Sequence, residues 1–163
     1  MDRLKDIINR NDFVSLKEWL SSDDNLKLKD EDLNTPLHLL CRYAMTVLKK
    51  AQYQSEEWKD HASLLLYVAE RFPDKNALNK DGCVPLHCVF IQDMEADSTP
   101  FKIIETLITS ENLNIQGGTQ RRTPIQMATE QRQWVIQEML IHRRADLNIQ
   151  DINGKNVLMI EVD

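Results

Sequence analysis

The chain has 163 residues, of which 42% are hydrophobic and 28% charged, so it can form one domain whose core needs neither disulfides nor metal. Its net charge of −6 argues against a general nucleic-acid surface and favours a protein partner with a basic surface. No apolar run approaches the length of a bilayer span, and the first residues lack the apolar segment of a signal peptide. We therefore expect a cytoplasmic or nuclear protein that is not secreted through a signal peptide and does not act at a membrane.

Three cysteines, Cys41, Cys83 and Cys88, are an odd number at spacings that do not match a metal site. They indicate a reducing compartment, with no disulfide framework. We expect no bound metal and no cofactor.

Residues 1–29 contain two short apolar patterns at helical spacing. Their members are Leu4, Ile7 and Ile8, followed by Phe13, Leu16, Trp19 and Leu20. The patterns predict a pair of helices, the second beginning at Asp12 or Ser15. No turn motif precedes this pair and its surroundings are polar, so we expect it to cover the first face of a repeat array.

A four-residue motif recurs along the rest of the chain. It reads Thr35-Pro36-Leu37-His38, Val84-Pro85-Leu86-His87, Thr123-Pro124-Ile125-Gln126 and, more faintly, Asn156-Val157-Leu158-Met159. A Thr hydroxyl can cap a helix, and Pro suits the first helical turn because its missing N–H is not needed there. Each motif therefore predicts the start of a helix.

Turn signals precede these motifs. Asn79–Gly82 and Asp151–Gly154 each end in a glycine that can adopt a positive φ. The sequence Leu113–Gln116 is repeated as Leu147–Gln150, which is 34 residues later. Units of turn, helix and helix at this period are typical of stacked-repeat proteins.

On these residues the chain resembles the ankyrin-repeat family over residues 30–163. It departs from that pattern at Gln126, which replaces the histidine, at Arg121, where the turn glycine is expected, and at Asn156-Val157, which replace Thr-Pro. The resemblance implies an all-α solenoid of stacked helix-turn-helix units with β-turn or hairpin tips. It also implies that the motif histidines hydrogen-bond the backbone of neighbouring turns, and that Gln126 partly substitutes for one.

We expect one domain over residues 1–163. It comprises a capping helix pair (1–29), unit 1 (30–78), unit 2 (79–116), unit 3 (117–150) and an incomplete unit 4 (151–163), which leaves open whether the natural chain continues past Asp163. Unit 1 carries an insertion at 44–60, without Gly or Pro, that predicts longer helices or a helical excursion before a second helix from Ala62 to Arg71. Unit 2 carries an acidic insertion at 92–100, and Thr99-Pro100 begins its second helix.

The sequence contains no phosphate-binding loop, nucleophile elbow or metalloprotease motif, so we expect a protein-protein interaction module and no enzyme. The resemblance implies that a partner binds on the concave face, with Tyr43 and Ile91 contributing most of the binding energy. The predicted contacts are Glu31, Asp32, Asn34, Arg42, Tyr43, Lys80, Asp81, Ile91, Gln92, Gln120, Arg122, Glu130 and Lys155, with Tyr53 and Trp58 of the insertion as further contacts. Their charge runs from acidic at the first tip to basic at the later ones.

Three alternatives stay open at this point. The chain is an inhibitor similar to the IκB group or a pathogen mimic of it; it is the amino-terminal regulatory segment of a larger enzyme, channel or effector; or His38, Cys41, His87 and Cys88 form a metal or catalytic site. The chain alone is expected to be a monomer.

Overall fold

A computed structural model of the protein describes residues 1–10, 12–50, 55–90 and 99–160, and these residues form α- and 3-10 helices with no strand. The prediction of an all-α protein is confirmed. The helices are α1 Asp2–Asn9, α2 Phe13–Leu20, α3 Asp23–Leu26, α4 Pro36–Lys50, α5 Glu56–Arg71, η1 Pro85–Cys88, α6 Thr99–Leu107, α7 Pro124–Glu130, α8 Trp134–His142 and η2 Val157–Met159.

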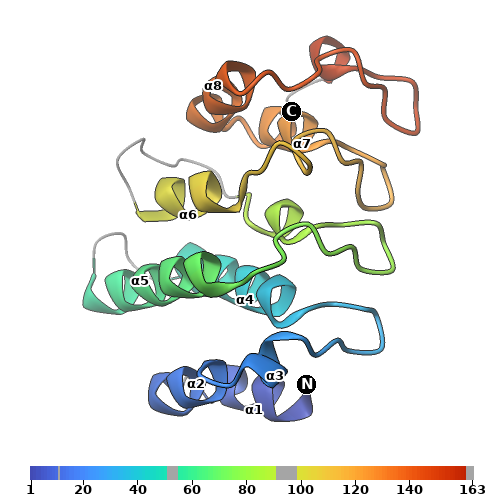
Figure 1. Cartoon of the computed structure of the whole chain (residues 1–163). Coiled ribbons are helices and arrows are strands. Elements are labelled where there is room, and N and C mark those ends of the chain that lie inside the picture. Colours follow the sequence, from blue (N-terminus) through green and yellow to red (C-terminus); the bar gives the residue numbers. More distant parts are fainter. Residues whose placement is uncertain (11, 51–54, 91–98, 161–163) are drawn as a thin grey trace.

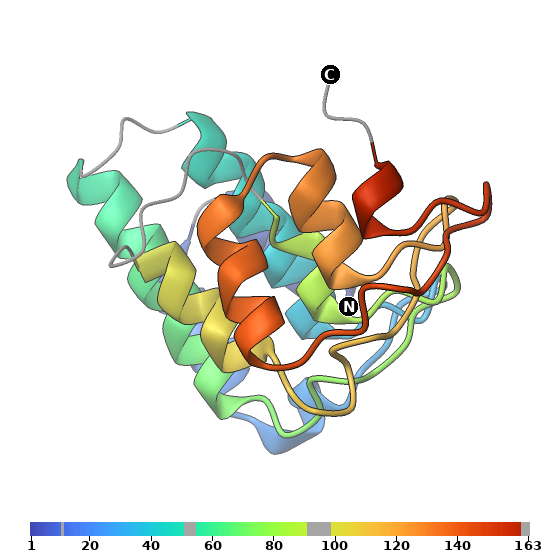
Figure 2. The same ribbon diagram turned by 90° about the horizontal axis from the view of Figure 1, so that it is seen from above.

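The helices lie in layers that follow the order of the sequence, as Figure 1 shows from the amino-terminal layer to the carboxyl-terminal one. The first layer contains α1 to α3, and the next three pair α4 with α5, η1 with α6, and α7 with α8. The turns between layers project from the same side of the stack (Figures 1 and 2). Each layer therefore presents one turn beside the turn of the layer before it.

Every predicted motif begins a helix, at Pro36, Pro85, Pro124 and Val157. Proline is accepted at the first three of these positions because the first turn of a helix leaves its N–H groups unpaired. The second and fourth motifs form single 3-10 turns, whereas the first and third form α-helices. In η1 the helix ends at Cys88, just before Val89 and Phe90, which are both buried.

Unit 1 has the longest helices, because α4 has 15 residues and α5 has 16 against the seven to nine residues of α6, α7 and α8. The prediction that the insertion lengthens both helices is confirmed. The predicted start of the second helix at Ala62 is wrong, because α5 begins at Glu56, where Lys59 forms an ion pair of 2.8 Å with the Glu56 carboxylate. In consequence α5 extends well beyond α2 of the layer below (Figure 1).

One apolar core runs through all the layers. Its fully buried members include Leu4 and Leu20 in the first layer, and further members are Leu37, Leu65, Leu86, Ile103, Ile125, Ile136 and Leu140. Burying one such side chain stabilises the fold by about 1.5–3 kcal/mol. In the first layer α2 begins after Asp12, as predicted, because the Asp12 carboxylate accepts a hydrogen bond of 3.0 Å from the Ser15 backbone N–H.

The turns contain residues with positive φ at the expected place. Gly82 and Gly154 have φ values of 69° and 76°, as the turn signals predict. Leu33 and Arg121 take the equivalent place in units 1 and 3 with φ values of 61° and 51°, where a side chain costs conformational free energy. The four turns thus share a positive φ at this position despite their different sequences.

Within the described ranges, no helix has both the length and the apolar character that crossing a membrane requires.

Candidate functional site at the turn edge

The residue that opens a turn holds the turn's shape in units 1, 2 and 4. Asp30 Oδ1 accepts hydrogen bonds from the backbone N–H groups two and four residues further on, at 3.0 and 2.9 Å. Asn79 Oδ1 accepts from the corresponding two N–H groups at 3.0 and 2.9 Å, and Asp151 Oδ1 at 2.8 and 3.0 Å. Side chains of Asp and Asn are suited to this role because their short oxygens reach their own turn.

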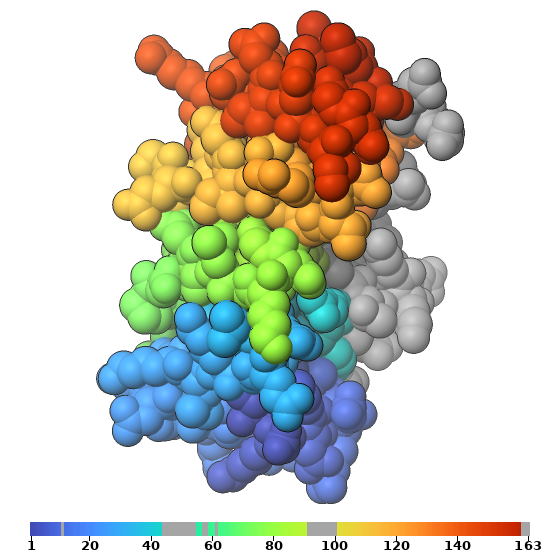
Figure 3. Space-filling view, turned by 90° about the vertical axis from the view of Figure 1, so that its right-hand side faces the viewer, coloured from blue at the N-terminus to red at the C-terminus, as the bar shows by residue number. Residues whose placement is uncertain are grey.

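Consecutive turns are also joined through their backbones. Lys80 N–H donates to the Asp32 carbonyl at 2.9 Å, and Gly118 N–H donates to the Asp81 carbonyl at 3.0 Å. Ile152 N–H donates to the Gln120 carbonyl at 3.0 Å in the same way. Seen in Figure 3, the four turns lie one above another along one side of the molecule. We call residues 30–34, 79–83, 117–122 and 151–155 the turn edge.

The fourth residue of each motif fastens the turn edge to the helices. His38 Nδ1 accepts from the Thr35 N–H at 3.2 Å, which leaves Nε2–H to donate to the Cys83 carbonyl of the next turn at 2.9 Å. His87 does the same with the Val84 N–H at 3.1 Å and with the carbonyls of residues 115 and 122 at 3.1 and 3.3 Å. The predicted bonding of these histidines to neighbouring turns is confirmed.

Gln126 takes the place of the histidine in unit 3. Its Oε1 accepts from the Thr123 N–H at 2.8 Å, and its Nε2 donates to the Ile149 and Lys155 carbonyls, each at 2.9 Å. The amide therefore makes the same pattern of bonds as the imidazoles, and the predicted substitution is confirmed.

The metal or catalytic alternative gains no support from this geometry. Burial lowers the pKa of His38 and of His87, and hydrogen bonds occupy both ring nitrogens of each. Burial raises the pKa of Cys88 to about 11 and that of Cys41 well above its ordinary value, so both thiols stay protonated. Within the described ranges, no three potential metal ligands gather in one place.

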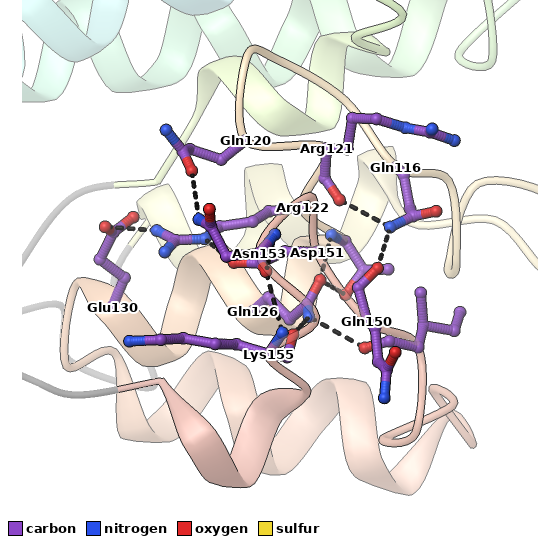
Figure 4. A network of polar contacts seen from close by, with 12 residues as sticks. Gln116, Gln120, Arg121, Arg122, Gln126, Glu130, Gln150, Asp151, Asn153 and Lys155 are labelled. Atoms are coloured by element: carbon purple, nitrogen blue, oxygen red, sulfur yellow. Dashed lines mark hydrogen bonds and ion pairs between the residues drawn. The ribbon is translucent and has the colours of Figure 1, made fainter.

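Units 3 and 4 are joined by a further polar network, shown in Figure 4. The Arg122 guanidinium forms ion pairs with Glu130 and, at 3.3 Å, with Asp151, and the side chains of Arg122 and Asp151 are only 14% and 0% exposed. Gln116 Nε2 donates to the Gln150 carbonyl at 2.7 Å. Burial alone would raise the pKa of Asp151, but the N–H groups of its turn and the Arg122 guanidinium lower it below its usual range.

Most of the predicted contact residues lie on the surface of this edge or beside it. The exposed ones at the turns are Glu31, Asp32, Lys80, Asp81 and Gln120, and Lys155 is partly exposed. Arg42 is exposed and Tyr43 partly buried on α4, while Glu130 is exposed at the end of α7. Lys80 reaches the Asp32 carboxylate of the preceding turn at 3.7 Å.

Two predicted contacts are not available on the surface. Asn34 is 4% exposed, because its Oδ1 accepts from Asn79 Nδ2 at 2.9 Å and its own amide donates to Asp30. Arg122 is held in the ion network between Glu130 and Asp151. Spacing within the motif places both residues correctly at a turn, but it does not reveal the partners that turn their side chains inward.

Four predicted contacts are not placed. Tyr53, Ile91 and Gln92 lie outside the described residues, and so does the side chain of Trp58, although its backbone belongs to α5. The predicted contacts leave out several exposed residues of the edge, among them Ile152, which is 60% exposed, and Leu33, which is 44% exposed at the first turn. Leu33 can be identified from the sequence, because it occupies the turn position at which Gly82 and Gly154 stand in units 2 and 4.

A groove lies between α2 and α5, the second helices of the first two layers. It encloses about 500 Å³ and is lined by Phe13, Lys17, Asp60, Ser63, Leu64 and Tyr67. No sequence pattern predicts this groove.

A scan against protein-family models gave no match, and a search among curated proteins also gave none.

Proposed function

We propose that the chain is a non-enzymatic protein-interaction module of the ankyrin type, which binds a partner protein across the turn edge and the adjoining first helices α4, η1 and α7. The proposal is supported by the repeated unit of turn and two helices, by the shared helix-starting motif and by the histidine and glutamine bonds between units. Stacked repeats of this kind offer an extended surface whose side chains vary while the frame is constant.

The observation that carries the proposal is that the edge has a fixed backbone and exposed side chains. The turns of units 1, 2 and 4 are each held by their own Asp or Asn, and each turn after the first donates a backbone N–H to a carbonyl of the turn before it. Glu31, Asp81 and Gln120 nevertheless face solvent. Because the backbone is already ordered, a partner does not have to supply the free energy of ordering these loops.

The exposed charges along the turn edge favour one orientation of the bound partner over the reverse one. Glu31, Asp32 and Asp81 are exposed carboxylates on the first two turns, whereas Arg121 and Lys155 lie on the last two. A partner segment with basic residues opposite units 1 and 2 is therefore favoured over one bound in the reverse register.

The test is a pull-down from lysate with a doubly charge-reversed edge, Glu31→Lys with Asp81→Lys. Its matched control is Glu18→Lys with Glu70→Lys, which changes the net charge equally but on the exposed faces of α2 and α5. A partner that binds the edge is retained by the wild type and by the control and is lost from the edge variant. With the purified partner, raising the salt concentration weakens binding, because exposed charges are screened.

Equal retention by all three proteins contradicts binding at the turn edge and directs attention to the groove between α2 and α5. Arg122→Ala would not test binding alone, because it breaks the ion network between units 3 and 4 and disturbs the fold. An inhibitor and a tether use the same edge, and an assay of the purified partner's activity in the complex distinguishes them.

A further inference from the structure

The groove between α2 and α5 lies on a side of the stack that the turn edge does not occupy. Both helices lie on the side away from the turns, one above the other (Figure 1). Within the described ranges, α5 packs along α6 of the layer above it but does not pack closely against α2 of the layer below. A partner bound in this groove therefore leaves the turn edge accessible.

The residues that line the groove follow helical spacing on both helices. On α5 they share one face, because they occupy positions i, i+3, i+4 and i+7, namely Asp60, Ser63, Leu64 and Tyr67. On α2, Phe13 and Lys17 are four residues apart and also share a face. At a rise of about 1.5 Å per residue, the lining face of α5 is roughly 10 Å long. The groove therefore has the length of about two turns of a third helix.

The groove offers apolar surface that the chain itself does not fully cover. Leu64 is 8% exposed, Phe13 is partly buried and Tyr67 is 44% exposed. The enclosed volume of about 500 Å³ lies within the range of about 300–1,000 Å³ that is usual for ligand pockets. An apolar side chain placed here releases water from both surfaces, and tyrosine is among the residues that contribute most to binding. Filling the groove with apolar side chains is therefore favourable.

The two walls of the groove carry opposite charges. Lys17 is exposed on α2, and Asp60 is exposed on α5. In the part of the chain that the structure describes, neither forms an ion pair, and the hydroxyls of Ser63 and Tyr67 have no hydrogen-bond partner. An occupant that places an acidic side chain beside α2 and a basic one beside α5 pairs with both charges at once. The groove therefore favours an occupant with unlike charges on its two flanks.

A helix fits these walls better than an extended segment or a second copy of the chain. The walls are the side chains of two helices, whose backbones bond mainly to themselves, so an extended segment finds no row of backbone partners there. A helix pairs its own backbone groups and presents an apolar stripe with polar residues on either side. A second copy would bring an identical hollow, and two hollows do not fill one another.

We propose that the groove binds an amphipathic helix of another protein. Apolar residues one turn apart on that helix fill the space between Phe13, Leu64 and Tyr67. An acidic residue on one flank pairs with Lys17, and a basic residue on the other flank pairs with Asp60. The chain then has two binding surfaces on opposite sides of the stack, so it can hold a helical partner in the groove and another protein at the turn edge.

The test uses a fluorescently labelled peptide of about 18 residues, which is long enough to form a helix in water. It contains Ala, Leu, Glu and Lys, with Leu at positions i, i+4 and i+7, Glu along one flank and Lys along the other. Fluorescence anisotropy measures its binding to the purified chain, and we expect saturable binding. A matched peptide with a central proline is expected to bind at least about tenfold more weakly, because proline breaks the helix.

Tyr67→Asp tests the groove itself. It is expected to raise the dissociation constant of the peptide at least about tenfold, since it places a charge in the apolar part of the groove. The matched control is Leu78→Asp, because Leu78 is 48% exposed against 44% for Tyr67 and lies outside the groove. The control should bind the peptide as the wild type does, and thermal melting of both variants checks that they keep the fold.

Lys17→Glu tests the charges, because it makes both walls of the groove acidic. It should weaken binding of the first peptide at least about threefold and strengthen binding of a peptide that carries Lys on both flanks. Lys102→Glu changes the net charge equally on the exposed surface of α6, and it should not alter the preference between the two peptides.

The absence of saturable binding at about 1 mM peptide overturns the proposal, and so does binding that Tyr67→Asp or the proline leaves unchanged. The edge variant, Glu31→Lys with Asp81→Lys, is expected to bind the peptide as the wild type does. Loss of peptide binding in that variant would place the peptide on the turn edge and overturn the proposal. An edge variant that loses the partner from lysate but keeps the peptide supports two separate surfaces.

Discussion

Units 2 and 3, and units 3 and 4, are held together by bonds from different side chains, and we call these two contacts joints. In the first, His87 donates to the carbonyl of Ile115 in its own unit and to that of Arg122 in the next. In the second, the Gln126 amide donates to the carbonyl of Ile149 in its own unit and to that of Lys155 in the next. The second joint adds the ion network of Arg122 with Glu130 and Asp151. The comparison teaches that the motif requires a donor and an acceptor on one side chain, and that this motif side chain is itself titratable only in the histidine joints.

The largest effect is expected from Asp151, which belongs to the turn and to the ion network at once. Asp151→Ala leaves two backbone N–H groups without their acceptor and removes one of the two carboxylates that pair with the mostly buried Arg122, and we expect it to lower the free energy of unfolding by about 3 kcal/mol. Asp151→Asn is expected to cost less, because Asn79 holds the turn of unit 2 with the same oxygen. Urea unfolding measures both; equal losses would show that the charge, and not the turn, carries the effect.

A smaller effect is expected when the joint between units 2 and 3 loses its histidine. His87→Leu removes the acceptor for the Val84 N–H and the donor to two carbonyls, and we expect a loss of about 2 kcal/mol. His87→Gln is expected to stay within about 1 kcal/mol of the wild type, since Gln126 makes these bonds in unit 3. If the Gln variant is as unstable as the Leu variant, the two joints are not interchangeable.

The smallest effect is a dependence on pH that belongs to the histidine joints alone. Burial holds the pKa of His38 and His87 below the ordinary value of 6.5, so the unfolded chain takes up protons first as the pH falls. The free energy of unfolding should therefore be highest above pH 6.5 and decrease between 6.5 and the lower pKa values of the folded protein. The carboxyls of Asp30 and Asp151 do not interfere, because their pKa values lie below 3.8.

Urea unfolding at a series of pH values measures this dependence in the wild type. The double variant His38→Gln with His87→Gln should give a flatter curve, because an amide does not titrate. A curve as steep as that of the wild type would place the titration elsewhere in the chain.

The start of each layer could be predicted from sequence because the motif carries its own physical reason. Proline suits the first turn of a helix, as at Pro36, Pro85 and Pro124. Asn and Asp indicate turns because their side chains accept hydrogen bonds from nearby backbone N–H groups, as at Asn79 and Asp151. Contacts between units were harder to predict, since they join residues far apart in the chain. Asn34 and Arg122 are examples, because each was expected at the surface and is turned inward by a partner in the next unit.

Some features depend on length and exposure, which the motif does not encode. The start of α5 at Glu56 comes from an insertion without a helix-breaking residue, so its boundary has no local signal. The groove beside α5 is lined by residues of both α2 and α5, and the pattern of neither helix alone predicts it. The exposure of Leu158, at 85%, likewise has no signal in the motif, because the residues at the same position of the other three motifs are buried.

The hydrogen bonds that the fourth residue of each motif donates all point the same way along the chain. His38, His87 and Gln126 each donate to carbonyls that come later in the sequence. During synthesis the helix that carries the donor leaves the ribosome before the turn that carries the acceptor, and amino-terminal parts fold first. Each new turn therefore meets a donor that is already in place, and the stack grows in the order in which it is translated.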